Sequence, residues 1–204
     1  MLNQAKVGKQ VASNGSVTDL RSEKTGSLII TSGHAKYMQT VLDGNVYIGA
    51  NLGGTPVTTQ AGLSVTTPAL TLYNPIGSGV FLVLQTVTLD ITTSPAAAAG
   101  LMLAYNLQNA AAPATVTLAN VTNGLIGISS QPVGQCYRIA TLAAAPLAFR
   151  FIGGTTGAAA IGGVQIIDHV DGEVIIRPGV AISVQSTSAA AILASFSWEE
   201  VPIW

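Results

Sequence analysis

Charged residues are scarce in this sequence. They make up 8% of its 204 residues, against about 25% in an average soluble protein. A monomer needs charged side chains on its surface to stay in solution. We therefore expect much of this surface to be covered by further copies of the chain or by a partner, and the sequence predicts a homo-oligomer.

Cysteine and long apolar segments are scarce too. Cys136 is the only cysteine, so no disulfide can form within the chain, and folding does not depend on an oxidising compartment. No run of 18 apolar residues occurs, which argues against a membrane-spanning helix. The N-terminal sequence MLNQAKVGKQ lacks the apolar core of a secretory signal. We therefore expect no membrane partner.

The few charges are distributed unevenly. The net charge is −1, so the chain as a whole lacks the basic character of a nucleic-acid-binding protein. Between residues 44 and 137 the only charged residue is Asp90. By contrast, residues 1–24 are polar and have no periodic apolar face, which predicts an extended arm in front of a single domain formed by residues 25–204. The arm residues predicted to contact a partner or a neighbouring subunit are Lys6, Lys9, Arg21 and Lys24.

After residue 45, apolar and polar residues alternate with a period of two, which is typical of strands with one face in a core. In one such segment Leu147, Phe149 and Phe151 alternate with smaller or polar residues, so these three side chains are expected in a core. The longer strands are expected at residues 86–92, 100–107, 147–151, 180–185 and 192–199. Shorter strands are expected at residues 28–31, 46–50, 70–73, 115–119 and 138–142.

Turn residues separate these segments. Asp171-Gly172 is a favoured two-residue type I′ loop, so the sequence VQIIDHVDGEVIIRP around it is expected to fold back as a hairpin, with Val170 opposite Glu173.

One short helix is expected at residues 34–44, where Tyr37 and Val41 share a face and Gly44 can end the helix. The remainder predicts an all-β fold of about eight to ten antiparallel strands. This is a jelly roll or a related β-sandwich that follows the extended N-terminal arm.

Residues with catalytic or metal-binding chemistry are few, and no recognisable motif in the sequence groups them into a site. A nucleophile needs a base and an orienting group, and neither histidine is near Cys136 in the sequence. The alternatives are a dyad of Cys136 with His34 or His169, a metal site within residues 168–173, and a carboxylate pair at Glu199-Glu200. Strand alternation places the two glutamates, and likewise Asp168 and His169, on opposite faces. We therefore expect no enzymatic activity, no cofactor and no metal.

Four segments together resemble a known family over residues 26–204. They are Tyr37 with residues 41–47 (VLDGNVY), residues 72–79 (LYNPIGSG), Pro178-Gly179, and residues 198–202 (WEEVP). The series resembles small virion proteins of tailed bacteriophages, some of which are capsid cement (decoration) proteins with a jelly-roll body. The resemblance implies a place on the capsid surface of the virion, with assembly in the host cytoplasm. It also implies a homotrimer rather than a dimer, contact with the major capsid protein, and no catalytic residue.

Three functions compete at this point. The first is a capsid cement protein that locks neighbouring capsomers together, with the basic arm reaching the capsid or a neighbouring subunit. The second is a tail fibre or receptor-binding module, for which aromatic residues at loop tips are expected. Here the aromatic residues fall mostly within strands, which favours the first. The third, a hydrolase of surface polysaccharide, is disfavoured because well-spaced carboxylates are scarce.

Overall fold

The computed structural model describes residues 35–51, 56–59, 62–93, 95–108, 111–157 and 164–203. The chain divides into two compact units, Met1–Met38 and Gln39–Trp204, and only residues 35–38 of the first unit are described. The predicted arm, with Lys6, Lys9, Arg21 and Lys24, therefore lies outside the described residues. So do the predicted strand at residues 28–31 and His34.

The helix predicted at residues 34–44 is shorter in the structure. α1 spans Met38–Leu42. After it, the Asp43 N–H donates to the Gln39 carbonyl at 2.9 Å, and the Gln39 side-chain amide donates to the Asp43 carboxylate at 2.9 Å. Gly44 then takes a φ of +76°, a backbone conformation that glycine adopts without steric cost. Gly44 ends the helix, as predicted.

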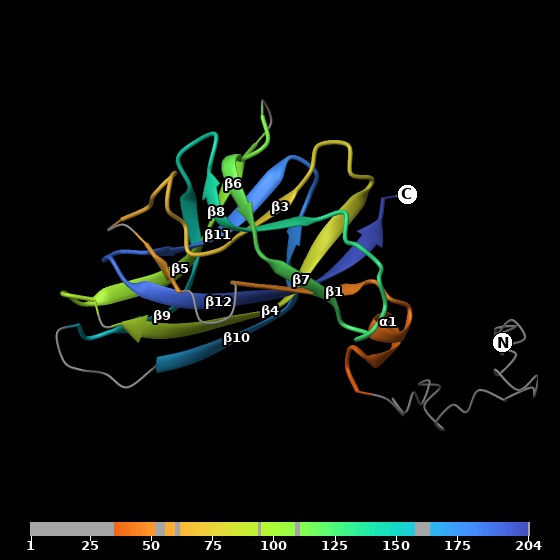
Figure 1. Ribbon diagram of the computed structural model, residues 1–204, viewed down its shortest axis with the longest axis horizontal. Coiled ribbons are helices and arrows are strands. Elements are labelled where there is room, and N and C mark those ends of the chain that lie inside the picture. Colours follow the sequence, from red (N-terminus) through yellow and green to blue (C-terminus); the bar gives the residue numbers. More distant parts are fainter. Residues whose placement is uncertain are drawn as a thin grey trace, which may run out of the picture. The chain divides into compact units, whose positions relative to one another are not determined.

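Two antiparallel sheets form a β-sandwich (Figure 1). The first sheet has the order β10-β4-β12-β1-β7, and β2 also pairs with β12. Its strands are β1 (Val46–Ala50), β2 (Val57–Thr58), β4 (Val80–Thr93), β7 (Asn120–Asn123), β10 (Val164–Ile176) and β12 (Ala191–Pro202). The second sheet has the order β6-β8-β3-β11-β5-β9. Its strands are β3 (Thr71–Asn74), β5 (Ala99–Leu107), β6 (Ala114–Leu118), β8 (Gln135–Thr141), β9 (Leu147–Thr155) and β11 (Val180–Ser186). The all-β prediction is confirmed, with twelve strands in the described residues rather than eight to ten.

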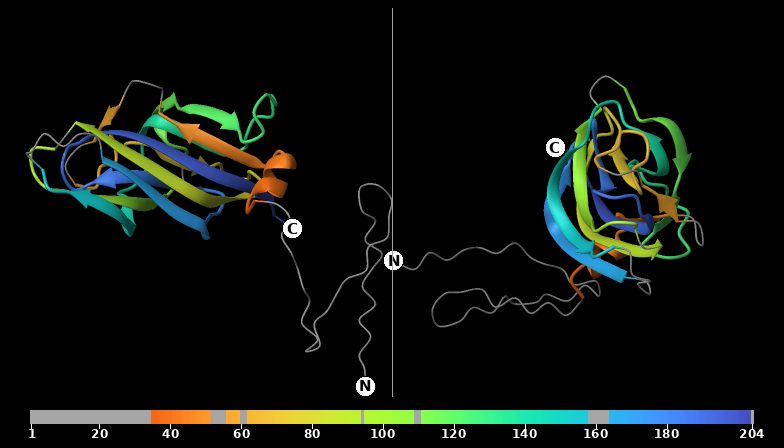
Figure 2. Two further views of the ribbon diagram at one scale, coloured as in Figure 1. Left: turned by 90° about the horizontal axis from the view of Figure 1, so that it is seen from below. Right: turned by 90° about the vertical axis from the view of Figure 1, so that its left-hand side faces the viewer.

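Eight of these strands pair in a nested order. β1 pairs with β12, β3 with β11, β4 with β10, and β5 with β9. This pairing distributes the eight strands over two packed sheets, which is the jelly-roll arrangement. β6, β7 and β8 lie between β5 and β9 in the sequence, and they extend the two sheets beyond β3 and β1. The sandwich therefore has two edges, one formed by β9 and β10 and the other by β6 and β7 (Figure 2).

The core lies between the two sheets, where alternate side chains of β4 and β12 meet those of the second sheet. Leu89, Phe196 and Trp198 are fully buried, as the period-two pattern predicts. The rings of Trp198 and Tyr47 are 6.0 Å apart. Burying a large apolar side chain stabilises the fold by about 1.5–3 kcal/mol, so these residues make this layer the main source of hydrophobic stabilisation.

Irregular segments cover the outer face of the second sheet. Gln185 of β11 accepts a hydrogen bond from the Ser64 N–H at 3.0 Å and donates to the Ser64 carbonyl at 3.0 Å. On the same sheet, the Gln108 side chain accepts from the Ala143 N–H at 3.1 Å. As a result, β11 is buried on both faces. The outer face of the first sheet and the two edges remain accessible.

The predicted hairpin at Asp171-Gly172 is wrong. Asp171 and Gly172 have φ of +54° and +88°, as a type I′ turn requires, but β10 does not fold back on itself. Both halves of β10 pair with β4, with a bulge between His169 and Val174. The long β4 offers a partner to both halves, and this pairing buries side chains from each half of β10 in the core.

The burial predicted for Leu147, Phe149 and Phe151 is also wrong. These residues form β9 as expected, but their side chains are 56%, 39% and 78% exposed. β9 is an edge strand of the second sheet, and the described part of the chain leaves much of this row uncovered. The pattern identified a strand with an apolar face, but it does not reveal whether the protein itself covers that face.

Candidate functional site

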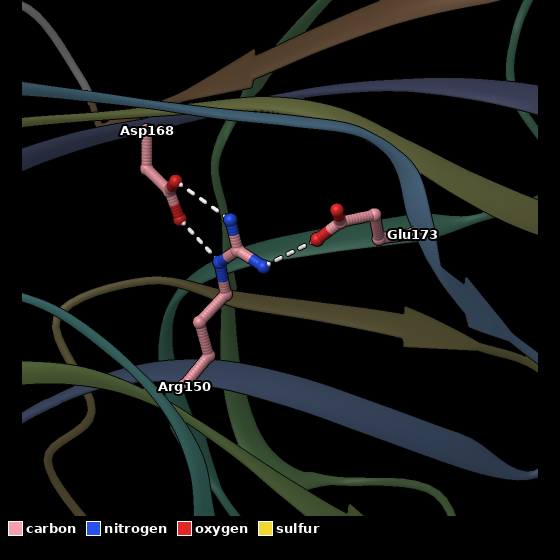
Figure 3. Close-up of polar contacts among 3 residues, drawn as sticks. All are labelled: Arg150, Asp168 and Glu173. Carbon is pink, nitrogen blue, oxygen red and sulfur yellow. Dashed lines mark hydrogen bonds and ion pairs between the residues drawn. The ribbon is translucent and has the colours of Figure 1, made fainter.

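An ionic cluster joins the two strands of the β9–β10 edge. Arg150 of β9 donates to Asp168 of β10 through Nε to Oδ2 at 2.8 Å and through Nη2 to Oδ1 at 3.0 Å. Its Nη1 donates to Oε2 of Glu173 at 2.8 Å. Figure 3 shows the two carboxylates converging on one guanidinium. These hydrogen bonds raise the pKa of Arg150 above its ordinary value, and the cluster ties together the edges of the two sheets.

The bulge in β10 makes this cluster possible. Asp168 and Glu173 lie five positions apart: Asp168 precedes the bulge, and Glu173 is the last residue within it. In a regular strand, residues an odd number of positions apart point to opposite faces. The extra residues of the bulge change this alternation, so that both carboxylates reach Arg150. Both of these carboxylates of β10 are therefore bound to Arg150 of β9, and we call this group of three residues the clamp.

An apolar groove of about 560 Å³ opens beside the clamp. It is lined by residues of β5, β9, β10 and β11, among them Tyr105, Leu107, Phe149, Val174 and Ile175. The rings of Tyr105 and Phe149 meet edge to face at 6.0 Å. Arg177 is the one charged side chain among the described residues that line the groove, so the groove suits an apolar surface rather than a polar substrate.

A second, smaller opening of about 290 Å³ lies near the other edge, where residues of β6, β7 and β8 meet. Leu118 lines it and is largely exposed, and Val116 and Ile139 are exposed on the same pair of strands. Both edges of the sandwich therefore present apolar side chains.

Cys136 is unsuited to nucleophilic chemistry. Its side chain is 1% exposed, and burial raises the pKa of its thiol to about 12. The thiolate is the reactive form of cysteine. His169 is exposed on β10 of the first sheet, where it pairs with Thr86 of β4, whereas Cys136 lies on β8 of the second sheet. The structure therefore does not bring His169 to the buried thiol. His34 lies outside the described residues.

Glu199 and Glu200 point to opposite faces of β12, as predicted, and do not form a shared site. Glu200 is buried, and its carboxylate accepts the backbone N–H groups of Val133 and Gly134 at 3.0 and 2.7 Å. It therefore fixes the segment before β8. Glu199 lies on the opposite face, where partial burial raises its pKa, a hydrogen bond with Gln85 lowers it, and the nearby Asp43 raises it.

The metal alternative at residues 168–173 finds no support in the geometry. Within the described ranges, no group of three or more His, Cys, Asp or Glu side chains could hold a metal ion. Two of the four possible ligands in this segment, Asp168 and Glu173, bind Arg150 instead.

The sequence interpretation missed the role of Arg150. The structure brings Asp168 and Glu173 to the same guanidinium. One signal was available: Arg138 and Arg150 are the only charged residues between Ile91 and Ile167. A partly buried arginine in so neutral a stretch is expected to pair with a carboxylate.

The chain matches no protein-family model, no curated protein and no solved structure. Among the helices in the described residues, none is long and apolar enough to cross a membrane.

Proposed function

We propose that this chain is a non-enzymatic structural component of a virus particle. It is a self-associating cement (decoration) protein that binds the outside of a phage head and stabilises contacts between neighbouring capsomers. The observation that carries the proposal is the excess of exposed apolar side chains. Within the described ranges, eighteen large apolar side chains are exposed, whereas eleven residues carry a charge. A surface of this kind is suited to permanent contacts with protein.

The cement function works through burial of this apolar surface. Each Å² of apolar area removed from water contributes about 25 cal/mol before the costs of association are subtracted. A subunit that contacts two capsomers at once adds this energy to their contact, so the capsomers separate less readily under internal pressure. The clamp of Arg150 with Asp168 supports this function because it keeps an edge of the sandwich rigid.

The basic arm contributes a second contact in this proposal. Lys6, Lys9, Arg21 and Lys24 bind the capsid or a neighbouring subunit. An extended residue spans at most about 3.3–3.6 Å, so residues 1–24 can reach tens of ångströms from the domain. The charged part of this contact weakens with salt, because exposed charges are screened within about 10 Å at 0.1 M ionic strength.

Deleting residues 1–24 tests the arm. The truncated protein is expected to oligomerise as before and to co-sediment much more weakly with empty capsids. A matched variant that replaces Lys6, Lys9, Arg21 and Lys24 with glutamine keeps the length of the arm and removes its basic charge. It is expected to lose the salt-dependent part of binding. Undiminished binding of both variants across a salt series would leave the arm without this function.

A tail fibre or receptor-binding module is the second candidate, and Phe149 and Phe151 favour it to some degree because both are exposed aromatics. They lie within β9 rather than at a loop tip. This position is better suited to a broad contact with another protein than to the binding of a receptor at a loop tip.

The number of copies in purified virus particles separates the two candidates. A cement protein is present at a copy number close to that of the shell protein, whereas a fibre module is present at a small fraction of it. Absence from the particle would contradict both.

A further inference from the structure

We propose that the β9–β10 edge is the surface through which two copies of this chain pair about a two-fold axis. This deepens the self-association in the proposed function and rests on that part alone, not on capsid binding. The contact is formed by an apolar patch around the 560 Å³ groove, and charged groups on both sides of Ile175 set its register.

The patch consists of Leu107, Leu147, Phe149 and Ile175. Their side chains are 43%, 56%, 39% and 59% exposed. Leu107, Phe149 and Ile175 line the groove, and Leu147 lies directly opposite Tyr105, a fourth lining residue. The four exposed side chains therefore form one continuous surface across β5, β9 and β10.

The patch supplies most of the apolar area of a standard protein–protein contact. A large side chain presents roughly 150–250 Å² when fully exposed, so at these exposures the four present on the order of 350 Å² of apolar surface. A standard interface buries roughly 800 Å² on each partner, of which about 450 Å² is apolar. The half-buried Tyr105 and Val174 in the groove extend the patch toward this value.

The charges around the patch are self-complementary. Glu173, Ile175 and Arg177 lie at alternate positions and are all exposed, so they form a row of an acid, an apolar residue and a base. A two-fold axis at Ile175 runs the row of one copy antiparallel to that of the other. Each Glu173, whose Oε2 binds Arg150 of its own copy, then faces the Arg177 of the other copy. An isologous contact requires this kind of self-complementary surface.

Other occupants fit the groove less well. A small-molecule site combines an apolar lining with several placed polar groups, and Arg177 is the one charged side chain among the described lining residues. A peptide added as an extra strand needs a regular sheet edge. The bulge between His169 and Val174 interrupts the edge of β10, and bulges of this kind block edge pairing. A second copy that makes contact through side chains meets neither obstacle.

The test uses the full-length chain with Ile175→Cys. On a two-fold axis this cysteine lies beside the same residue of the other copy, so mild oxidation should give a disulfide-linked dimer on a non-reducing gel. The native Cys136 is buried and does not compete. Ile48→Cys is the matched control. Ile48 is similarly exposed but lies on β1, three strands away from β10, and it should give no dimer above the wild-type background.

Ile175→Glu tests the same contact without cross-linking. Because Ile175 is exposed, the variant should keep the circular dichroism of the wild type while its sedimentation changes from dimer to monomer. Ile48→Glu should remain a dimer. If Ile175→Cys fails to cross-link, or if Ile175→Glu keeps the wild-type mass, the edge is not the interface. A wild-type trimer, the state that the family resemblance implies, or a wild-type monomer would also overturn the inference. Capsid co-sedimentation of the same proteins tests the cement function separately.

Discussion

Arg150 of β9 binds Asp168 of β10 through two parallel hydrogen bonds, at 2.8 and 3.0 Å. The two residues belong to different sheets, so this bidentate pair ties the layers of the sandwich together at their open edge. Charge-assisted bidentate pairs are among the stronger hydrogen-bonded contacts in proteins. The pair lies next to the apolar groove and connects the fold with the surface proposed for self-association.

Asp168→Asn should weaken this link. The amide offers one acceptor oxygen in place of two, so Arg150 loses one of its charge-assisted bonds. We expect the free energy of unfolding to fall by about 1–3 kcal/mol, measured by urea denaturation.

Asp90→Asn is the control for this substitution. Asp90 lies on β4, on the outer face of the first sheet, and no ion pair to it is seen among the described residues. Its substitution should change the stability by less than about 0.5 kcal/mol. Equal effects of the two substitutions would show that the Arg150 clamp contributes nothing specific.

The thiol of Cys136 should react very slowly in the folded protein. With its pKa raised to about 12 by burial, almost none of the thiol is ionised at pH 8, and the thiolate is the reactive form. Alkylation by iodoacetamide should be at least about a hundredfold slower than that of an ordinary free thiol with a pKa of about 8.5.

The rate for Cys136 should rise to the ordinary value in denaturant. The exposed cysteine of Ile175→Cys gives an internal comparison in the folded state. Fast native labelling at position 136 would contradict the buried, un-ionised thiol.

The sequence predicted the strands better than it predicted their surroundings. The patterns in β4 and β12 led to the correct faces because both strands lie in the middle of the first sheet, where the second sheet covers one face. The same kind of pattern misled at β9. A row of apolar residues shows that a strand has a face that it could bury. Whether that strand lies in the middle or at the edge of a sheet depends on how all the strands of the chain pair.

The turn at Asp171-Gly172 shows a second limit of sequence interpretation. Its local backbone was predicted correctly, since both residues have positive φ. The direction of the chain after the turn depends on β4, about eighty residues earlier in the sequence, and local propensity carries no information about that partner. The clamp was missed for the same reason, because Arg150 meets Asp168 only through the packing of two sheets.

Glu199→Gln should remove a loss of stability that grows as the pH rises. Partial burial raises the pKa of Glu199 in the folded state, so the folded protein holds this proton more tightly than the unfolded chain does. The stability from this group is therefore present at low pH and is lost as the pH rises from the unfolded pKa through the raised folded one. The variant should be more stable than the wild type near pH 7.

The two proteins should become similar below the unfolded pKa of the glutamate, at about pH 4. Thermal unfolding of both proteins from pH 3 to 8 measures the difference. A constant difference across this range would contradict the raised pKa.

Gly49→Ala should disturb the core at one point. A Cβ at this position on β1 would lie 2.7 Å from the Sγ of Cys136 and 3.1 Å from the Trp198 ring, both closer than ordinary contact. Overpacking of this kind destabilises by about 1–3 kcal/mol. Gly100→Ala, on β5, is the matched control, because the nearest atom to its Cβ would be a methyl carbon of Thr187 at 3.6 Å. It should change the stability by less than about 0.5 kcal/mol.

The Cys136→Ala background separates the two contacts of the added methyl group. Removing Sγ eliminates the closest clash, while the contacts with the Cβ of residue 136 and with Trp198 remain at 3.0 and 3.1 Å. In this background Gly49→Ala should therefore cost less than in the wild type, but more than zero. A double-mutant cycle measures this coupling directly, since neighbouring residues that share a contact give non-additive effects. Additive effects would mean that β1 moves away from β8 as a whole, and the close approach at Gly49 would then not limit the packing of the two sheets.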